Sequence, residues 1–536
     1  MTSRRARLAG TVAGGALVIT LVTIVSRVLG LGRWAAQASE VGSTGVGEAY
    51  AVANLLPNVL FEVVAGGALA GAVVPVVAGA IARRAHADVS RSASAMLSWT
   101  LLALVPVGAL VALLAPQVVA ILPRVNDPEL VDIAVFLLRV FAVQVPLYGV
   151  SVVAAGILQA HRRFFWPAAA PIMSSVVVIA SYVVFGALAD GHQTTPDLLS
   201  SASLRWLAWG STAGVAALSL PLLVPVHRAG VRLRPTLRFP PGEGAKARSL
   251  ALAGIGALVA QQISVVVLLL VAGAHGEAGA YPVFQYAQAV YLTPYAVLAV
   301  PLATSTFPHL SEHAATGDGS RFARLAAVSV RGVVVVSVAG AALLVAASRP
   351  IEVFFGFTEG GAAHMATAIA WLAPGMVGLA LVFHASRLLY ATSHARAAVV
   401  AASCGWLTIA VASLAGAVLL VPGHDTETVF RVMGGSSTLG MTVGAVLLLA
   451  AVRRHLGAST LRGVARTSGI ALVTAAGVCA LLGRLAGSLA PSGSSVWRGA
   501  WVAALAGGLA LVVVLAVGSL ADRSAVRGLI RGEGRG

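Results

Sequence analysis

The feature that most constrains this sequence is its supply of apolar runs, each long enough to cross a membrane. A spanning α-helix needs about 20 mainly apolar residues, because it rises about 1.5 Å per residue through a hydrocarbon layer about 30 Å thick. The 536 residues contain fourteen such runs. They lie at 10–32, 50–82, 93–117, 131–158, 164–188, 204–226, 250–273, 284–308, 325–347, 364–386, 397–421, 431–452, 467–489 and 498–520.

Composition supports the same class of protein. Hydrophobic residues make up 58% of the chain, charged residues only 10%, and the mean hydropathy is +0.91. The net charge of +17 is spread in short clusters between apolar runs, so it does not indicate a nucleic-acid-binding face. We therefore predict an all-α polytopic membrane protein with about fourteen transmembrane helices.

The basic residues also predict an orientation, because cytoplasmic loops carry an excess of Lys and Arg. With the N-terminus inside, 26 of the 36 basic residues fall in cytoplasmic segments, seven fall outside and three fall within spans. Arg387 is counted with the cytoplasmic segments. We expect a multi-pass protein of the cytoplasmic (inner) membrane with both termini cytoplasmic.

The longest polar stretch divides the chain into related halves. We predict an N-terminal six-helix lobe at 1–226, a cytoplasmic linker at 227–249 and a C-terminal six-helix lobe at 250–455. Two extra helices and a basic tail follow at 456–536. Proline pairs at Pro57 and Pro75 and at Pro294 and Pro308 occupy similar places in the two lobes. Such repeats surround a central cavity in many transporters.

The run that begins at Val25 places charges where a membrane protein rarely keeps them. Arg27 and Glu62 fall inside predicted spans, and Arg33 and Glu48 fall near the outer mouths. An intramembrane charge costs about 2.5–3.5 kcal/mol on insertion scales and usually faces a cavity or a partner. We expect these residues to line a cavity.

Two structural alternatives apply to the arginines. Arg27 pairs with Glu62 in one, and Arg33 anchors the helix at the lipid headgroups in the other. The two arginines are six residues apart and lie on different faces of a regular helix, although Gly30 and Gly32 permit a bend.

No enzyme motif is present: the sequence has no HExxH pair, no Walker loop and no nucleophile elbow. We predict a non-enzymatic protein without a cofactor or a metal. The seventh, eleventh and twelfth runs contain no Asp, Asn or Glu to bind a sodium ion, which favours drive by the membrane potential or a substrate gradient.

Ordered motifs give this chain a family resemblance. The sequence is similar to the MurJ/MviN lipid II flippases of the multidrug/oligosaccharidyl-lipid/polysaccharide exporter superfamily, over about residues 10–455. It resembles the actinobacterial form, and we expect no extra C-terminal domain. The motifs that carry the resemblance are Ser26-Arg27-Val28-Leu29-Gly30, Glu48-Ala49-Tyr50, Leu56-Pro57-Asn58, Gly67-Ala68, Val74-Pro75, Gln159 to Phe164, and Ser386-Arg387 with Tyr390-Ala391.

The resemblance implies translocation of the undecaprenyl-diphosphate-linked peptidoglycan precursor, lipid II, by alternating access. It implies a lipid-linked glycan and membrane lipids as partners, with cell-wall synthesis proteins as a further class and no nucleic acid. Arg27 and Arg33 match arginines that the family places in its cavity. The predicted substrate-binding residues are Arg27, Arg33, Glu48, Asn58 and Glu62.

The sequence departs from the family pattern at several charges. Phe61-Glu62 stands where many members carry two arginines, Trp34 where they carry Asp, and Gln288-Ala289 where the pattern often reads Asp-Arg. Two alternatives therefore stay open: a flippase for another polyprenyl-linked polysaccharide precursor, and a non-transporting scaffold of cell-envelope assembly.

The predicted topology can be measured with single cysteines. Cysteines near Asp88, Gly244 and Gly534 should resist an impermeant thiol reagent in intact cells, because we place them in the cytoplasm. Cysteines near Asp190 and Asp425 should react. Labelling near Gly244 from outside would overturn the whole assignment.

Overall fold

The computed structural model describes residues 2–63, 70–82, 85–121, 127–241, 243–244, 255–356 and 362–522. Every regular element in these residues is helical, as predicted. The chain forms two compact units, Met1–Gln262 and Ile263–Gly536. The predicted lobe boundaries stay predictions. The Gly67-Ala68 motif, part of the predicted linker and the basic tail lie outside the described residues.

Unit 1 is a bundle of long helices joined by short turns. Its helix α1 runs without interruption through residues predicted to form the first span. The elements are α1 (Thr2–Glu40), α2 (Val46–Glu62), α3 (Ala70–Ala82), α4 (His86–Leu113), α5 (Ala115–Ile121), α6 (Pro128–Phe141), α7 (Gln144–Ala160), α8 (Phe165–Ala189), η2 (Pro196–Leu198), α9 (Ser201–Ser219), η3 (Leu220–Leu222) and α10 (Leu223–Arg228).

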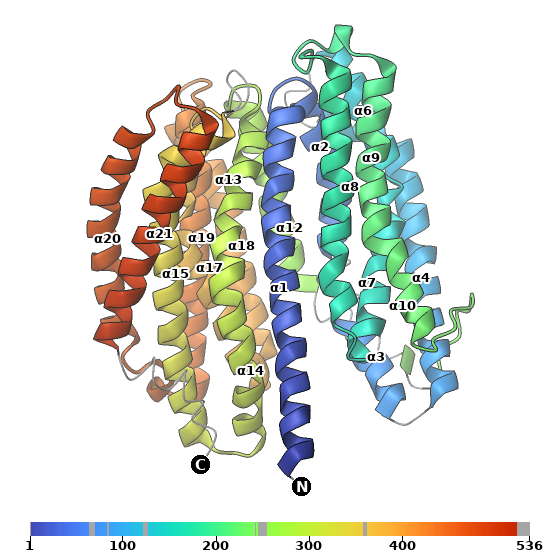
Figure 1. Cartoon of the computed structure of the whole chain (residues 1–536), viewed down its shortest axis with the longest axis vertical. Helices are drawn as coiled ribbons and strands as arrows, with labels where there is room; N and C mark the ends of the chain where they lie inside the picture. Colours follow the sequence, from blue (N-terminus) through green and yellow to red (C-terminus); the bar gives the residue numbers. More distant parts are fainter. Residues whose placement is uncertain are drawn as a thin grey trace. The chain divides into compact units, whose positions relative to one another are not determined.

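The packing of unit 1 places α8 between α1 and α9, with α7 also against α9 (Figure 1). One apolar core joins α3, α4 and α7 through buried side chains such as Val76, Met96 and Ile157. Small residues allow close approach: a Cβ on Gly156 of α7 would lie 2.6 Å from a methyl group of Val73. These contacts fix α3, α4 and α7 relative to one another within the unit.

After α10 the chain forms an extended strap that lies along α4. The backbone N–H groups of Arg232, Arg234 and Thr236 donate to the hydroxyls of Ser90, Ser94 and Ser98, at 3.2, 3.0 and 3.1 Å. Two residues of extended chain advance about 6.6 Å and four helical residues about 6.0 Å, so the two spacings nearly match. The helix therefore satisfies the polar backbone of the strap, part of the segment predicted as a linker.

Unit 2 contains the longest run of packed helices. Its elements, with α12 crossing the boundary between the units, are α12 (Ile255–His275), α13 (Ala280–Pro294), η4 (Tyr295–Ala299), α14 (Val300–Ala315), α15 (Gly319–Phe355), α16 (Met365–Leu372), α17 (Gly375–Ala391), α18 (Ala395–Leu420), α19 (Thr426–Leu456), η5 (Ala458–Leu461), α20 (Val464–Leu489) and α21 (Val496–Ala521).

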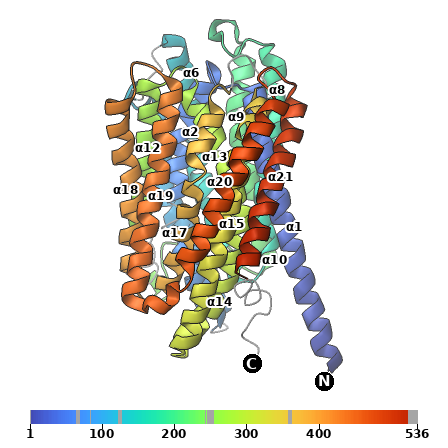
Figure 2. The ribbon, with the colours of Figure 1, turned by 90° about the vertical axis from the view of Figure 1, so that its left-hand side faces the viewer.

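Helix α15 is the centre of unit 2. It packs against α14, α16, α17, α20 and α21, and α20 and α21 lie side by side against it (Figures 1 and 2). Helices α18 and α19 form a second close pair. A Cβ on Gly440 would lie 2.5 Å from the carbonyl oxygen of Gly405, so this pair needs glycine to approach as closely as it does.

A largely buried ion pair joins the last helices to α15. Arg331 Nε lies 2.7 Å from Asp522 Oδ2, with the two side chains 11% and 13% exposed. The Nε–H is not aligned for a hydrogen bond, so this contact is an ion pair. Arg331 Nη1 donates to the carbonyl of Arg462 at 2.7 Å, and the Thr467 hydroxyl donates to Asp522 at 3.0 Å. The span charge at Arg331 is thus neutralised.

A proline breaks the helix between α16 and α17. Pro374 has no N–H to donate, and the two helices meet at an angle of 43°. Thr438 of α19 satisfies the freed backbone: its hydroxyl donates to Trp371 O at 2.6 Å and accepts from Gly375 N at 3.1 Å. A side chain from a neighbouring helix thereby makes the break tolerable in an apolar environment.

The predicted count of fourteen spans is not confirmed. Eleven helices of the described residues are long and apolar enough to cross a membrane, and the bent pair α16–α17 makes a twelfth. These twelve correspond to the last twelve predicted runs. The first predicted run falls on α1, and the second is divided between α2, which ends at Glu62, and α3, which begins at Ala70.

The ion pair of Arg331 predicts a specific pattern of stability. Asp522→Ala should destabilise the protein by about 3–5 kcal/mol, because it leaves a buried guanidinium without its carboxylate. The Arg331→Met, Asp522→Leu double variant should recover most of this loss. Thermal unfolding of purified protein in lipid nanodiscs measures both.

Arg321→Gln is the matched control for this measurement. Arg321 forms an exposed pair with Asp318 of the same unit, at 3.4 Å, and exposed pairs contribute about 0–1 kcal/mol. Equal effects of Asp522→Ala and Arg321→Gln would show that the buried pair has no special role.

Candidate functional site

The two arginines of α1 differ in their surroundings. The Arg27 side chain is exposed, whereas Arg33 is half-buried with its guanidinium carbon 5.7 Å from the centroid of the Trp34 ring. Helix α1 continues through Gly30 and Gly32 without a break. The two arginines therefore lie about 120° apart around the helix axis, on different faces. The glycines do not bring them together.

Arg33 and Glu62 share an electrostatic neighbour that sequence reasoning missed. Both interact electrostatically with the phenol of Tyr148 on α7, as does Tyr50. Phe61 packs on the same phenol, with ring centroids 4.4 Å apart. The signal in the sequence was a polar pair, Gln144 and Tyr148, within an apolar run. In the structure the Tyr148 hydroxyl donates to Gln144 Oε1 at 3.4 Å, and the Gln144 amide donates to the Thr212 hydroxyl at 3.1 Å.

The predicted alternative of an Arg27–Glu62 salt bridge is absent. Among the residues that the structure describes, Arg27 forms no ion pair, and no cation contributes to the electrostatics of Glu62. Glu62 is exposed on α2, and Asn58, four residues earlier, is exposed on the same face. Three of the five predicted site residues, Arg27, Asn58 and Glu62, thus present polar groups at the surface of unit 1.

Glu48 has a different setting from the other site residues. It is only 7% exposed and lies in the first turn of α2, where a carboxylate is favoured by the N-terminal end of the helix dipole. A ligand would reach it only after the neighbouring side chains moved.

A buried network of hydroxyl groups connects the helices around the part of α1 that carries Arg33. The Tyr50 hydroxyl lies 2.8 Å from that of Tyr182 and 2.9 Å from that of Ser211. Tyr182 donates to Gln37 at 3.3 Å, so α1, α2, α8 and α9 meet at one point. Since Gln37 is one helical turn after Arg33, this network fixes the part of α1 that carries Arg33.

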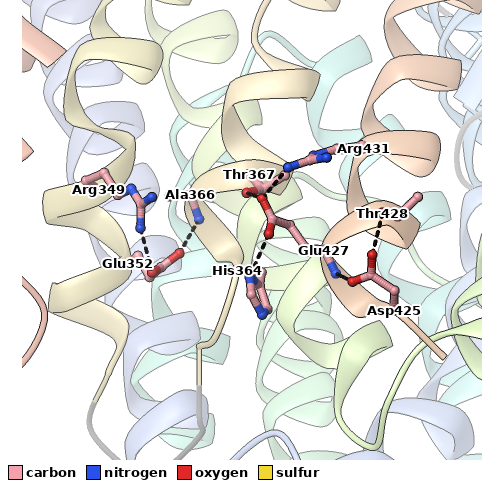
Figure 3. Close-up of polar contacts among 9 residues, drawn as sticks. All are labelled: Arg349, Glu352, His364, Ala366, Thr367, Asp425, Glu427, Thr428 and Arg431. Atoms are coloured by element: carbon pink, nitrogen blue, oxygen red, sulfur yellow. Dashed lines mark hydrogen bonds and ion pairs between the residues drawn. The ribbon is translucent and has the colours of Figure 1, made fainter. Parts of the chain in front are cut away.

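A second polar cluster lies at helix ends in unit 2, where no site was predicted (Figure 3). Glu427 bonds Arg431 at 2.6 Å and lies 3.8 Å from His364, and Glu352 accepts from the N–H of Ala366 at 2.7 Å. Hydrogen bonds from the Thr428 hydroxyl and from backbone N–H groups lower the pKa of Asp425, which caps α19.

This cluster has the character of a set of helix caps. Its side chains connect α15, α16 and α19 and are partly solvated, which limits their energetic value. Within the described ranges, no group of three or more His, Cys, Asp or Glu side chains could hold a metal ion.

Comparison with known proteins decides the family. The family model described as "Lipid II flippase MurJ" matches residues 37–501. This chain belongs to the lipid II flippase MurJ family. The lipid II flippase MurJ of Burkholderia cenocepacia is 26% identical over 380 residues, which cover 68% of this chain and 70% of the relative. The probable lipid II flippase MurJ of Synechocystis sp. is 30% identical over 230 residues, 41% of each chain.

Solved structures show the same fold. A lipid II flippase MurJ in an inward closed conformation aligns with a TM-score of 0.70 at 18% identity, over 95% of this chain and all of the other. An inward-facing multidrug resistance MATE family transporter of the MOP superfamily aligns at 0.65 and 15% identity, over 83% of this chain and 99% of its own. The family resemblance is confirmed, and this MurJ family member is a multi-pass cell-membrane protein.

The geometry of Arg27 predicts the behaviour of its variants. Arg27→Ala should lower transport at least tenfold without loss of inserted protein, because the side chain is exposed and holds no other helix in place. Arg27→Lys should recover part of the activity, since a point charge lacks the planar fork of guanidinium. Complementation of flippase-depleted cells measures transport, and immunoblotting of membranes measures insertion.

The charge-swapped Arg27→Glu, Glu62→Arg variant should remain inactive, because these two residues do not pair. Arg205→Ala, an exposed arginine that bonds only within α9, is the matched control and should retain activity. Recovery of transport in the charge-swapped variant would show that Arg27 has a structural role.

Proposed function

We propose that this protein is a flippase that carries undecaprenyl-diphosphate-linked peptidoglycan precursor, lipid II, across the cytoplasmic membrane. The observation that carries the proposal is membership of the lipid II flippase MurJ family over residues 37–501. The curated relatives carry the same name, as lipid II flippase or probable lipid II flippase. The protein works by alternating access, with the substrate exposed first to the inner leaflet and then to the outer leaflet.

The residues of unit 1 suit a lipid diphosphate. Arg27 offers an exposed guanidinium at a depth where a charge is costly, and a planar fork can bind phosphate oxygens in pairs. Arg33 lies on a different face of α1 and interacts electrostatically with Tyr148. Arg27 and Arg33 bind the diphosphate in this proposal, and Asn58 and Glu62 bind polar groups of the saccharide or peptide. Glu48 binds the substrate only if the side chains around the start of α2 move apart.

The proposal includes the orientation and the partners. Both termini are cytoplasmic, the two lobes are those predicted from the sequence, and the protein works beside cell-wall synthesis proteins. The chain has a transporter's fold, and we propose that it catalyses no covalent reaction. Transport draws on the membrane potential or the substrate gradient.

One observation favours a second candidate substrate. Phe61 packs on Tyr148 where the family pattern supplies an arginine, and α13 presents Gln288 and Ala289 where it often supplies a charged pair. A site with fewer cations fits a different glycan on the same polyprenyl diphosphate. The alternative of a scaffold keeps the fold without transport.

A depletion experiment tests the proposed function. Cells depleted of their own lipid II flippase and expressing this chain should expose labelled lipid II on the outer leaflet at a level close to that of undepleted cells. Cells that express the Arg27→Ala variant provide the matched control.

The outcomes separate the candidates. Absence of outer-leaflet lipid II despite normal insertion would exclude lipid II as the substrate. Transport of another polyprenyl-linked glycan in the same assay would identify a changed specificity, and transport of none would identify a scaffold.

A further inference from the structure

A half-buried arginine of unit 2 has an unusual environment. Arg387 lies on α17, four residues before the helix ends, although the sequence placed it in a loop segment. Its guanidinium carbon is 3.6 Å from the centroid of Phe383 and 6.0 Å from that of Phe307 on α14. One Nη1–H donates to the carbonyl of Phe383 at 3.3 Å. Aromatic rings therefore hold the group in place.

The other arginines of unit 2 are either exposed or neutralised. Within the described residues of this unit, only Arg331 and Arg387 have side chains that are not exposed. Asp522 supplies the carboxylate that neutralises Arg331. Arg387 forms no ion pair with a described residue, and its electrostatic neighbours are Tyr295, Tyr390 and His384. Its positive charge is thus uncompensated by a carboxylate.

This environment leaves Arg387 able to bind an anion. Guanidinium has five N–H donors in a rigid fork, and the contact with Phe383 O occupies one of them. Stacking on an aromatic face stabilises the cation but leaves its edge free. A planar cation with further N–H donors matches phosphate oxygens, which accept in pairs.

We propose that Arg387 is a second phosphate-binding subsite of this flippase, located in unit 2 and selective for a polyprenyl diphosphate. The inference rests on the proposed function, because it takes the substrate class from there. Arg387 supplies this cation from α17.

A plainer role must be distinguished from this one. An arginine in the last turns of a helix also interacts with the negative end of the helix dipole and can anchor to any lipid headgroup. An anchor would bind phosphatidylglycerol as well as a polyprenyl diphosphate. The experiment therefore compares the two lipids.

Native mass spectrometry of the purified full-length protein measures binding of undecaprenyl diphosphate and, separately, of phosphatidylglycerol. Arg387→Gln should weaken undecaprenyl diphosphate binding about tenfold or more, because a charge-assisted hydrogen-bond pair is lost. Arg387→Lys should fall between wild type and Arg387→Gln. Phosphatidylglycerol binding should not change. Arg396→Gln, an exposed arginine on α18, is the matched control and should leave both unchanged.

Each other result overturns a stated claim. Equal undecaprenyl diphosphate binding by wild type and Arg387→Gln would remove the subsite and leave the proposed function standing. An equal loss for both lipids would make Arg387 a headgroup anchor. A wild-type protein that binds no undecaprenyl diphosphate would overturn the proposed function itself.

Folding of the variants is controlled by a second change and a second measurement. Phe383→Leu removes the aromatic support but keeps the charge, and should weaken undecaprenyl diphosphate binding less than Arg387→Gln does. Thermal unfolding of all variants should stay near that of the wild type. If Arg387→Gln unfolds at a much lower temperature while Phe383→Leu binds like the wild type, Arg387 is structural and the proposal fails.

Discussion

The cost of an isolated charge at membrane depth governs the polar groups of this protein. Three arginines meet that cost in different ways. Arg331 is neutralised by Asp522 and so fastens α20 and α21 to α15. Arg387 is held by aromatic rings and phenols. Arg27 is exposed on α1 without an ion-pair partner among the described residues, which is the arrangement expected of a group that meets its partner in a ligand.

The same constraint applies to the backbone, whose N–H and C=O groups must be satisfied away from water. Thr438 bridges the break at Pro374, and three serines of α4 receive the N–H groups of the strap. Both arrangements depend on a helix that is distant in sequence. These two irregular segments are therefore stabilised by hydroxyl groups that another helix supplies at the right spacing.

The departures from the family pattern also follow a physical logic. Phe61 is not simply a lost cation, because its ring packs at a tilt of 37° against Tyr148, a residue that also interacts electrostatically with Arg33 and Glu62. In unit 2, α13 carries Gln288 and Ala289, whereas Arg387 on α17 belongs to a motif that the chain shares with the family. A diphosphate needs positive charge within reach but not from one fixed helix.

The sequence alone determined the fold class, because runs of about 20 apolar residues admit only membrane helices. Its ordered motifs indicated the family, and the cost of intramembrane charge singled out Arg27 and Glu62. It could not decide which charges meet. The Arg27–Glu62 pair was compatible with the sequence but does not form, whereas the electrostatic influence of both Arg33 and Glu62 on Tyr148 depends on how α1, α2 and α7 pack. The sequence assigned Arg387 to a cytoplasmic segment, whereas the structure places it within α17 and near Phe307 of α14. Periodicity and hydropathy predict which residues enter the membrane. Contacts between helices depend on side-chain packing among segments that are far apart in the chain.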